Sequence, residues 1–362
     1  MRVCYFGEYA PNYARNWVIR TGLATQGVEV IPCQVPLAPT NGRLRLYHCL
    51  LQRFTFISGP LDALFVAEIN HAVMPLAWLL ARRHRLLILF DPFVSRYDSL
   101  VLDRKQIAQR SWRAGYLYWS DRISMNLADH VLADTHQHRL YYQEKLRVIR
   151  PITVVPIGAN PQIFHPVSNA AQVTKKKSSP FQVVFWGKFI PLQGVQYILQ
   201  AAHILEQQVA PVRFSIYGSG QTFAEMQRLA RELNLTNVTF YGFIPVEQLP
   251  QHIWQADVTL GIFGDTEKAR RVVPNKVYEG LAMAKPVITG DSPAIREFFA
   301  PGEHLHTVPM ADPEALAEAI LYLARDEEYR RYLARQGYEH FRANFTPEHI
   351  GRRVKDVLEQ LV

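Results

Sequence analysis

Short apolar runs alternate along the chain with longer stretches of helical periodicity. Runs of strand length lie at residues 3–6, 28–33, 63–66, 86–90, 130–133 and 154–155, and again at 181–186, 213–217, 238–241, 258–262, 286–289 and 305–308. Between them, apolar residues recur with the spacing of amphipathic helices. Strands that alternate with helices form parallel sheets with helices on both faces, so the pattern predicts an α/β fold of two Rossmann-like units.

A polar, basic segment separates the two units. Residues 168–180, SNAAQVTKKKSSP, have the composition of a linker, so we predict one domain at residues 1–167 and another at 181–346. A last amphipathic helix is expected at 347–362. With 362 residues, of which 48% are hydrophobic, the chain is long enough to form two cores.

The stretch VPNKVYEGLAMAKPVI at residues 273–288 predicts a helix that opens at Pro274. The free N–H groups at a helix start attract phosphate, and Asn275 and Lys276 lie in this first turn. Glu279, on roughly the same face, can accept hydrogen bonds from the two hydroxyls of a ribose. These residues predict a nucleotide site, and the alternative is an ordinary amphipathic helix with solvated charges.

A second motif, FWGKFIPLQG at residues 185–194, has the pattern of a strand, a turn and a helix. Ligands of open α/β sheets bind outside the carboxyl ends of the strands. Gly187 would let the backbone approach a phosphate there, and Lys188 would pair with its charge. The alternative is a turn with a solvated lysine.

The motifs FWGKFIPLQG, IYGSG, FYGFIP, ADVTLGIFG and PNKVYEGLAMAKPVITG follow one another in an order that resembles the donor-binding half of GT-B glycosyltransferases of the retaining family 4 type. The resemblance covers nearly all of residues 180–345, and the first half matches more loosely through YFGEYAPNYARN, LFDPFVSRYDSLVLDR and VVPIGANPQIFHP. It implies a GT-B architecture with parallel sheets facing a central cleft. It also implies that the last helix, 347–362, crosses back and packs on the first domain.

The resemblance also implies roles for single residues. Lys188 would contact the donor diphosphate and act as a catalytic residue, Glu279 would bind the ribose, and the backbone at Ile244 would contact the base. The full set of expected donor-binding residues is Gly187, Lys188, Gly194, Ile244, Gly261, Phe263, Gly264, Arg271, Asn275, Lys276 and Glu279.

Two positions depart from the family pattern. Gln193 stands where relatives carry a second lysine in the glycine loop, and Arg271 stands where they carry the first of two glutamates. A diphosphate would then lack one cation. Basic residues between the GIFGD loop and Glu279 are close enough in sequence to supply it, namely Lys268, Arg270, Arg271 and Lys276. The alternative is a solvated basic turn.

Asp91 is the catalytic candidate of the first half. It follows the apolar run at 86–90, so we expect it at the carboxyl end of a strand, near where relatives carry a histidine that contacts the donor sugar. It could orient the acceptor hydroxyl or help to accept its proton. The alternative is a turn opened by Asp91 and Pro92.

Other polar residues of the first half are also candidates. Arg15 and Asn16 follow the loop after the first strand, and we expect them on the acceptor or diphosphate side. In the sequence ADTHQH, either Asp134 or Thr135 should cap a helix, which leaves His138 as a lesser catalytic candidate.

No metal or cofactor is required by the sequence. The chain has no DxD carboxylate pair, so we expect a helix start and Lys188 to stabilise the leaving diphosphate without a divalent metal. Cys4, Cys33 and Cys49 lack the spacing of a metal or redox site, and we expect them to be reduced.

The charge is concentrated in the first half. Residues 1–170 have 19 Lys and Arg against 11 Asp and Glu, whereas residues 171–362 have 21 of each. A basic surface there could attract anionic lipid or an acidic acceptor. The best patch is next to Trp78 and consists of Arg82, Arg83, His84 and Arg85, although a solvated helix end is the alternative. No nucleic-acid-binding motif accompanies the basic residues.

The location is expected to be cytosolic, with the basic surface touching the inner face of the membrane. The first strand meets Glu8 before a signal-peptide core can form, and the apolar stretch at residues 61–80 is interrupted by polar residues.

We therefore expect a glycosyltransferase that moves a sugar from a nucleoside-diphosphate sugar to a hydroxyl acceptor, whether a glycan, a lipid-linked or a small molecule. Retention of configuration is implied by the resemblance alone. Two alternatives stay open, namely a nucleotide-sugar epimerase on the same fold and a non-catalytic nucleotide-sugar-binding module, which Gln193 and Arg271 make credible.

Overall fold

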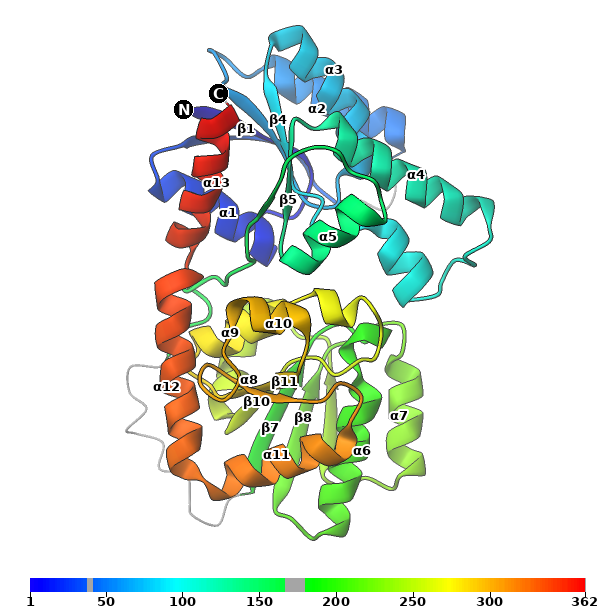
Figure 1. The fold of residues 1–362 in the computed structure, drawn as a ribbon, viewed down its shortest axis with the longest axis vertical. Helices are drawn as coiled ribbons and strands as arrows, with labels where there is room; N and C mark the ends of the chain where they lie inside the picture. The colour runs from blue at the N-terminus through cyan, green and yellow to red at the C-terminus, as the bar shows by residue number, and fades with distance from the viewer. Residues whose placement is uncertain (38–41, 167–179, 362) are drawn as a thin grey trace. The chain divides into compact units, whose positions relative to one another are not determined.

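The computed structural model describes residues 1–37, 42–166 and 180–361, so the linker predicted at residues 168–180 lies outside the described residues except for Pro180. The chain forms two compact units (Figure 1), one made of Met1–Gly158 with Phe345–Val362 and the other of Ala159–Asn344. Each unit contains a six-stranded sheet in which neighbouring strands are parallel. The predicted α/β fold is confirmed.

The sheet of the first unit has the order β2-β1-β3-β4-β5-β6. Successive strands are added on one side of β1 and then on the other, so the strand order reverses between β1 and β3 while the strands stay parallel. Its strands are β1 (Arg2–Glu8), β2 (Glu29–Val35), β3 (Ala63–Val66), β4 (Leu87–Phe90), β5 (His130–Ala133) and β6 (Ile152–Val154). Its helices are α1 (Ala14–Thr25), α2 (Arg43–Thr55), α3 (Met74–His84), α4 (Trp112–Leu127), α5 (His136–Glu144) and α13 (Pro347–Leu361).

The core of this unit follows from the alternation of side chains along its strands. Cys4 and Phe6 of β1 belong to the cluster covered by α2, α3, α4 and α5, whereas Val3 and Tyr5 belong to the cluster covered by α1 and α13. Figure 1 shows α13 beside α1. A Cβ on Gly351 would lie 2.0 Å from the carbonyl carbon of Gly22, so this helix pair needs glycine where the backbones touch.

The second sheet has the order β12-β11-β10-β7-β8-β9, so the strand order reverses between β7 and β10. Its strands are β7 (Phe181–Trp186), β8 (Val212–Tyr217), β9 (Val238–Gly242), β10 (Val258–Leu260), β11 (Val287–Gly290) and β12 (His306–Val308). Its helices are α6 (Val195–Gln207), α7 (Phe223–Glu232), α8 (Leu249–Gln255), α9 (Asn275–Ala282), α10 (Pro293–Phe298), α11 (Pro313–Arg325) and α12 (Glu327–Asn344).

Each strand predicted from the sequence is present, with ends shifted by at most about two residues, as is usual for boundaries. The helix predicted to open at Pro274 begins one residue later, because Pro274 has the extended backbone of an N-cap. Cys4 and Cys33 are buried, and all three cysteines are free. Among the described residues, no helix combines the length and the apolar character that crossing a membrane requires.

Candidate functional site

The loops that follow β7 and β10 pack against each other at the reversal point of the second sheet, which is where such sheets bind ligands. The N–H of Phe263 donates to the carbonyl of Gln193 at 3.1 Å, and the N–H of Gly264 donates to that of Leu192 at 3.3 Å. Gly194 has a φ of +66°, and a Cβ on it would lie 2.4 Å from the Gly264 nitrogen. Glycine is therefore required here both by the turn and by the close approach.

Lys276 places its ammonium group beside this glycine loop. The residue lies in the first turn of α9 and is only 4% exposed. Its Nζ donates to Oε1 of Gln193 and lies 3.6 Å from the centre of the Phe185 ring. A Cβ on Gly187 would lie 3.0 Å from the same Nζ, so the absent side chain makes room for the lysine. The amino group of a lysine from α9 thus lies at Gln193, the position where the resemblance led us to expect a lysine.

Glu279 lies one turn further along α9 and is also buried. Trp186, the last residue of β7, donates its indole N–H to Oε2 of Glu279 at 2.6 Å. Burial raises the pKa of Glu279 to about 7, although the hydrogen bond from Trp186 and the charge of Lys276 act to lower it. Burial lowers the pKa of Lys276, against the attraction of Glu279. An anion that reaches Lys276 would therefore favour its charged form.

The other predicted donor-binding residues have different settings. Lys188 is exposed directly after Gly187, and Asn275 is half-buried at the start of α9. Gly261 is buried, and a Cβ on it would lie 2.2 Å from the Thr289 hydroxyl, so its glycine serves packing. Ile244 is half-buried after β9.

Arg271 belongs to a short helical turn, Ala269–Arg271, and its Nη1 lies 3.8 Å from Oε2 of Glu267. Four basic residues could supply the missing cation. Among them, Lys276 donates a hydrogen bond to Gln193 in the described part of the chain. Arg270 is exposed. The donor role of Arg271 stays a prediction.

Arg15 and Asp91 form a buried ion pair in the first unit. Both side chains are fully buried, and Nε and Nη2 of Arg15 lie 2.8 and 3.2 Å from the two carboxylate oxygens. Nη1 of Arg15 donates to the carbonyls of Val155 and Pro156 at 2.7 and 2.9 Å. Because the pair satisfies itself inside the unit, the structure favours a structural role. The predicted contacts of Arg15 with the diphosphate and of Asp91 with the acceptor stay predictions.

Asn16, the neighbour of Arg15, is likewise buried and bonded within the unit. Its Oδ1 accepts from the Tyr5 hydroxyl at 2.9 Å, and its Nδ2 donates to the carbonyl of Ala10 at 2.9 Å. The side chain therefore holds the loop after β1, and its predicted contact with a ligand also stays a prediction.

Glu68 is a candidate that the sequence analysis missed. It follows β3, and the order of the first sheet reverses between β1 and β3. Its Oε2 is buried without a hydrogen-bond partner among the described residues. Burial and the charge of Asp91 raise the pKa of Glu68 to about 8, while a hydrogen bond from Asn16 lowers it. The only signal in the sequence was a glutamate directly after an apolar run, at a strand's carboxyl end.

The Thr135 hydroxyl caps α5 by accepting from the N–H of His138 at 3.0 Å, which confirms one of the two predicted caps. Nδ1 of His138 bonds Oδ1 of Asp134, and the ring stacks on Tyr142 with centroids 5.7 Å apart. Nε2 of His138 is buried and has no hydrogen-bond partner within the described parts of the chain. The imidazole is thus held by its carboxylate neighbour, and a catalytic role for it stays a prediction.

Residues 167–340 match the family described as Glycosyl transferases group 1. A glycosyltransferase of amylovoran biosynthesis from Erwinia amylovora is 22% identical over 216 residues, which cover 58% of this chain and 51% of that protein. The chain spans about half the length of the curated relatives it matches.

Solved structures resemble the whole chain, and two of them illustrate the similarity. Sucrose-phosphate synthase from Thermosynechococcus elongatus has a TM-score of 0.74 at 20% identity, over 99% of this chain and 98% of its own. HepE from Anabaena, solved with UDP-glucose, has a TM-score of 0.74 at 14% identity, over 99% and 100%. These likenesses confirm the predicted GT-B fold. The family match concerns residues 167–340, and the two solved structures show a similar fold for the whole chain.

Proposed function

We propose that the protein transfers a sugar from a nucleoside-diphosphate sugar to a hydroxyl group of an acceptor, with retention of configuration. The observation that carries the proposal is the buried pair of ionisable side chains on α9, Lys276 and Glu279, beside the glycine loop that follows β7. Together they offer a cation to a diphosphate and a carboxylate to a ribose. The UDP-glucose bound to HepE supports a donor of this class.

The chemistry asked of these residues is electrostatic. When the bond between the sugar and the diphosphate breaks, negative charge grows on the leaving group. Lys188, Lys276 and the start of α9 would stabilise this charge. The leaving diphosphate would take the proton of the acceptor hydroxyl as that oxygen bonds to the sugar carbon on the same face. In the first unit, we propose that Glu68 contacts the acceptor, because its Oε2 is available for a hydrogen bond.

Glu279→Ala should weaken binding of the cognate nucleoside diphosphate by ~2–3 kcal/mol, because charged hydrogen bonds to the ribose are lost inside a buried site. Titration calorimetry measures the effect. A dissociation constant equal to that of the unmodified protein would remove Glu279 from the donor site.

Glu279→Gln serves as the control for charge, since the amide still accepts from Trp186. The carboxyl group of Glu279 is protonated below about pH 7 and ionised above it. The dissociation constant of the variant, divided by that of the unmodified protein, should therefore grow as the pH rises through this value. A ratio that does not change with pH would show that the ionised form has no special role.

The proposed function is tested with a panel of nucleotide sugars. One of them should raise the unfolding temperature and, with an acceptor, yield a glycosylated product. Lys188→Ala should lower kcat by roughly 10²-fold, because one stabiliser of the leaving diphosphate is lost. Stabilisation without any product would favour the binding module, and donor turnover without an acceptor would favour the epimerase. A loss confined to KM would mean that Lys188 only binds the donor.

A further inference from the structure

Helix α4 presents apolar side chains on its outer face, where surface helices normally carry polar ones. The exposed side chains recur at positions i, i+4, i+7 and i+11, as Trp112, Tyr116, Trp119 and Ile123. Trp112 is 78% exposed, and Trp119 and Ile123 are each 53% exposed. An exposed stripe of large apolar side chains marks an interaction surface.

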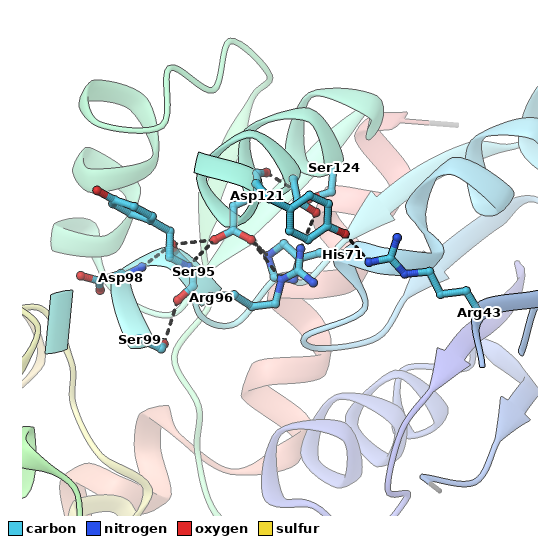
Figure 2. A network of polar contacts seen from close by, with 11 residues as sticks. Arg43, His71, Ser95, Arg96, Asp98, Ser99, Asp121 and Ser124 are labelled. Carbon is cyan, nitrogen blue, oxygen red and sulfur yellow. Dashed lines mark hydrogen bonds and ion pairs between the residues drawn. The ribbon is translucent and has the colours of Figure 1, made fainter. Parts of the chain in front are cut away.

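The inner face of α4 is fixed by a polar network, which Figure 2 shows. Asp121 of α4 is fully buried and accepts from Oγ of Ser95 at 2.8 Å and from Nε of Arg96 at 3.1 Å. Burial lowers the pKa of the neighbouring His71 to about 4, so Arg96 supplies the positive charge at this carboxylate. Asp121 is the only acidic residue of positions 104–127, and it points inward. The outer face of α4 therefore carries no negative charge, and the helix cannot turn to bury its aromatic side chains.

Arginine side chains lie over the exposed aromatic rings. The guanidinium of Arg113 lies 5.7 Å from the Trp112 ring centre, and that of Arg122 lies 5.0 Å from the Trp119 ring centre. From α2, Arg43 lies 5.5 Å from the centre of the Tyr116 ring and bonds its hydroxyl. A groove of about 460 Å³ lies between these side chains, lined by Arg43, Ile107, Trp112, Arg113, Tyr116 and Leu117.

We propose that the outer face of α4 docks on the surface of an anionic phospholipid bilayer. The indole rings of Trp112 and Trp119 suit the boundary between headgroups and acyl chains, where tryptophan is enriched, and Ile123 adds apolar area. Arg113, Arg122 and Arg43 supply the positive charge that anionic headgroups attract. The proposal does not depend on the sugar-transfer function.

Other occupants fit the surface less well. A second copy bound through the same face would bring arginines against arginines, since a twofold interface pairs the same patch with itself. The patch on α3 predicted from the sequence has two exposed apolar residues, Trp78 and Leu79, but Arg82 is within 4.0 Å of Asp129. The face of α4 has no acid to offset its arginines.

The test is co-sedimentation of the full chain with phosphatidylcholine vesicles, with and without phosphatidylserine, at low salt. The unmodified protein should bind the anionic vesicles and shift its tryptophan emission to the blue. Two double variants should each weaken vesicle binding by about tenfold or more. One is Trp112→Ser with Trp119→Ser, and the other is Arg113→Glu with Arg122→Glu. Arg335→Glu, an exposed position on α12, should bind as the unmodified protein does. Circular dichroism and melting temperature show whether each variant folds.

Three results would overturn the proposal. The unmodified protein could fail to bind anionic vesicles at low salt. Changing Arg82, Arg83 and Arg85 to Glu could abolish vesicle binding while both α4 variants bind vesicles normally. That result would place the membrane contact on α3. The protein could also self-associate, or bind a single-stranded oligonucleotide more tightly than vesicles. If Trp112→Ser and Trp119→Ser removed that association, the face of α4 would have an occupant other than a bilayer.

Discussion

Lys276→Gln should lower the single-turnover rate of sugar transfer by roughly 10²-fold or more, because the variant removes the buried amino group that we propose faces the leaving diphosphate. Lys276 is the basic side chain bonded to Gln193, and burial already lowers its pKa, so its charge depends on an anionic partner. Rapid-quench measurement with saturating donor gives the rate of the chemical step.

Arg270→Gln is the matched control for that variant. Arg270 lies in the same basic segment but is exposed, so losing its charge should leave the single-turnover rate close to normal. If Arg270→Gln slows transfer as much as Lys276→Gln, the basic segment acts through its overall charge, and the specific position of Lys276 is unimportant.

Arg15→Met should lower the free energy of unfolding of the first unit by about 3–5 kcal/mol, because it leaves the carboxylate of Asp91 buried without its partner. Arg15 holds both carboxylate oxygens, and neither side chain reaches solvent. Denaturant unfolding followed by fluorescence measures the change.

The double variant Arg15→Met with Asp91→Leu tests whether the unpaired charge causes this loss of stability. Removing both charges should restore much of the lost stability, since neither member of the pair is then left buried without the other. As a surface comparison, Arg296→Met breaks an exposed pair with Asp291 and should change the unfolding midpoint little. If Arg15→Met is as mild as Arg296→Met, Asp91 does not need Arg15, and its predicted contact with the acceptor gains support.

The strands and the donor-side loops could be predicted from the sequence because their signals are local. Each apolar run is a single strand, and the glycine loop of residues 187–194 and the start of α9 lie directly beside such runs. Gly194 ends the motif predicted as a strand, a turn and a helix, and its positive φ and its contact with Gly264 show why no other residue fits. Local chemistry of this kind can be read without knowing the order of the strands.

The pairings across the chain could not be predicted in the same way. Lys276 and Gln193 are 83 positions apart, and Arg15 and Asp91 are 76 positions apart. Which of several basic residues meets Gln193 depends on the neighbouring positions of β7 and β10, which only the sheet order gives. Arg15 and Asp91 each have the chemistry of a ligand-binding group, and their mutual contact is invisible when each is considered alone.

The single-turnover rate of the exchange variant, Gln193→Lys combined with Lys276→Gln, tests most directly whether Lys276 supplies the cation missing from the glycine loop. Gln193→Lys alone should destabilise the second unit, because two ammonium groups would meet in a buried site. In the exchange variant, one cation stays at the same place on the other side chain, so most of the rate lost in Lys276→Gln should return. An exchange variant that folds, binds donor and still transfers as slowly as Lys276→Gln would contradict the account.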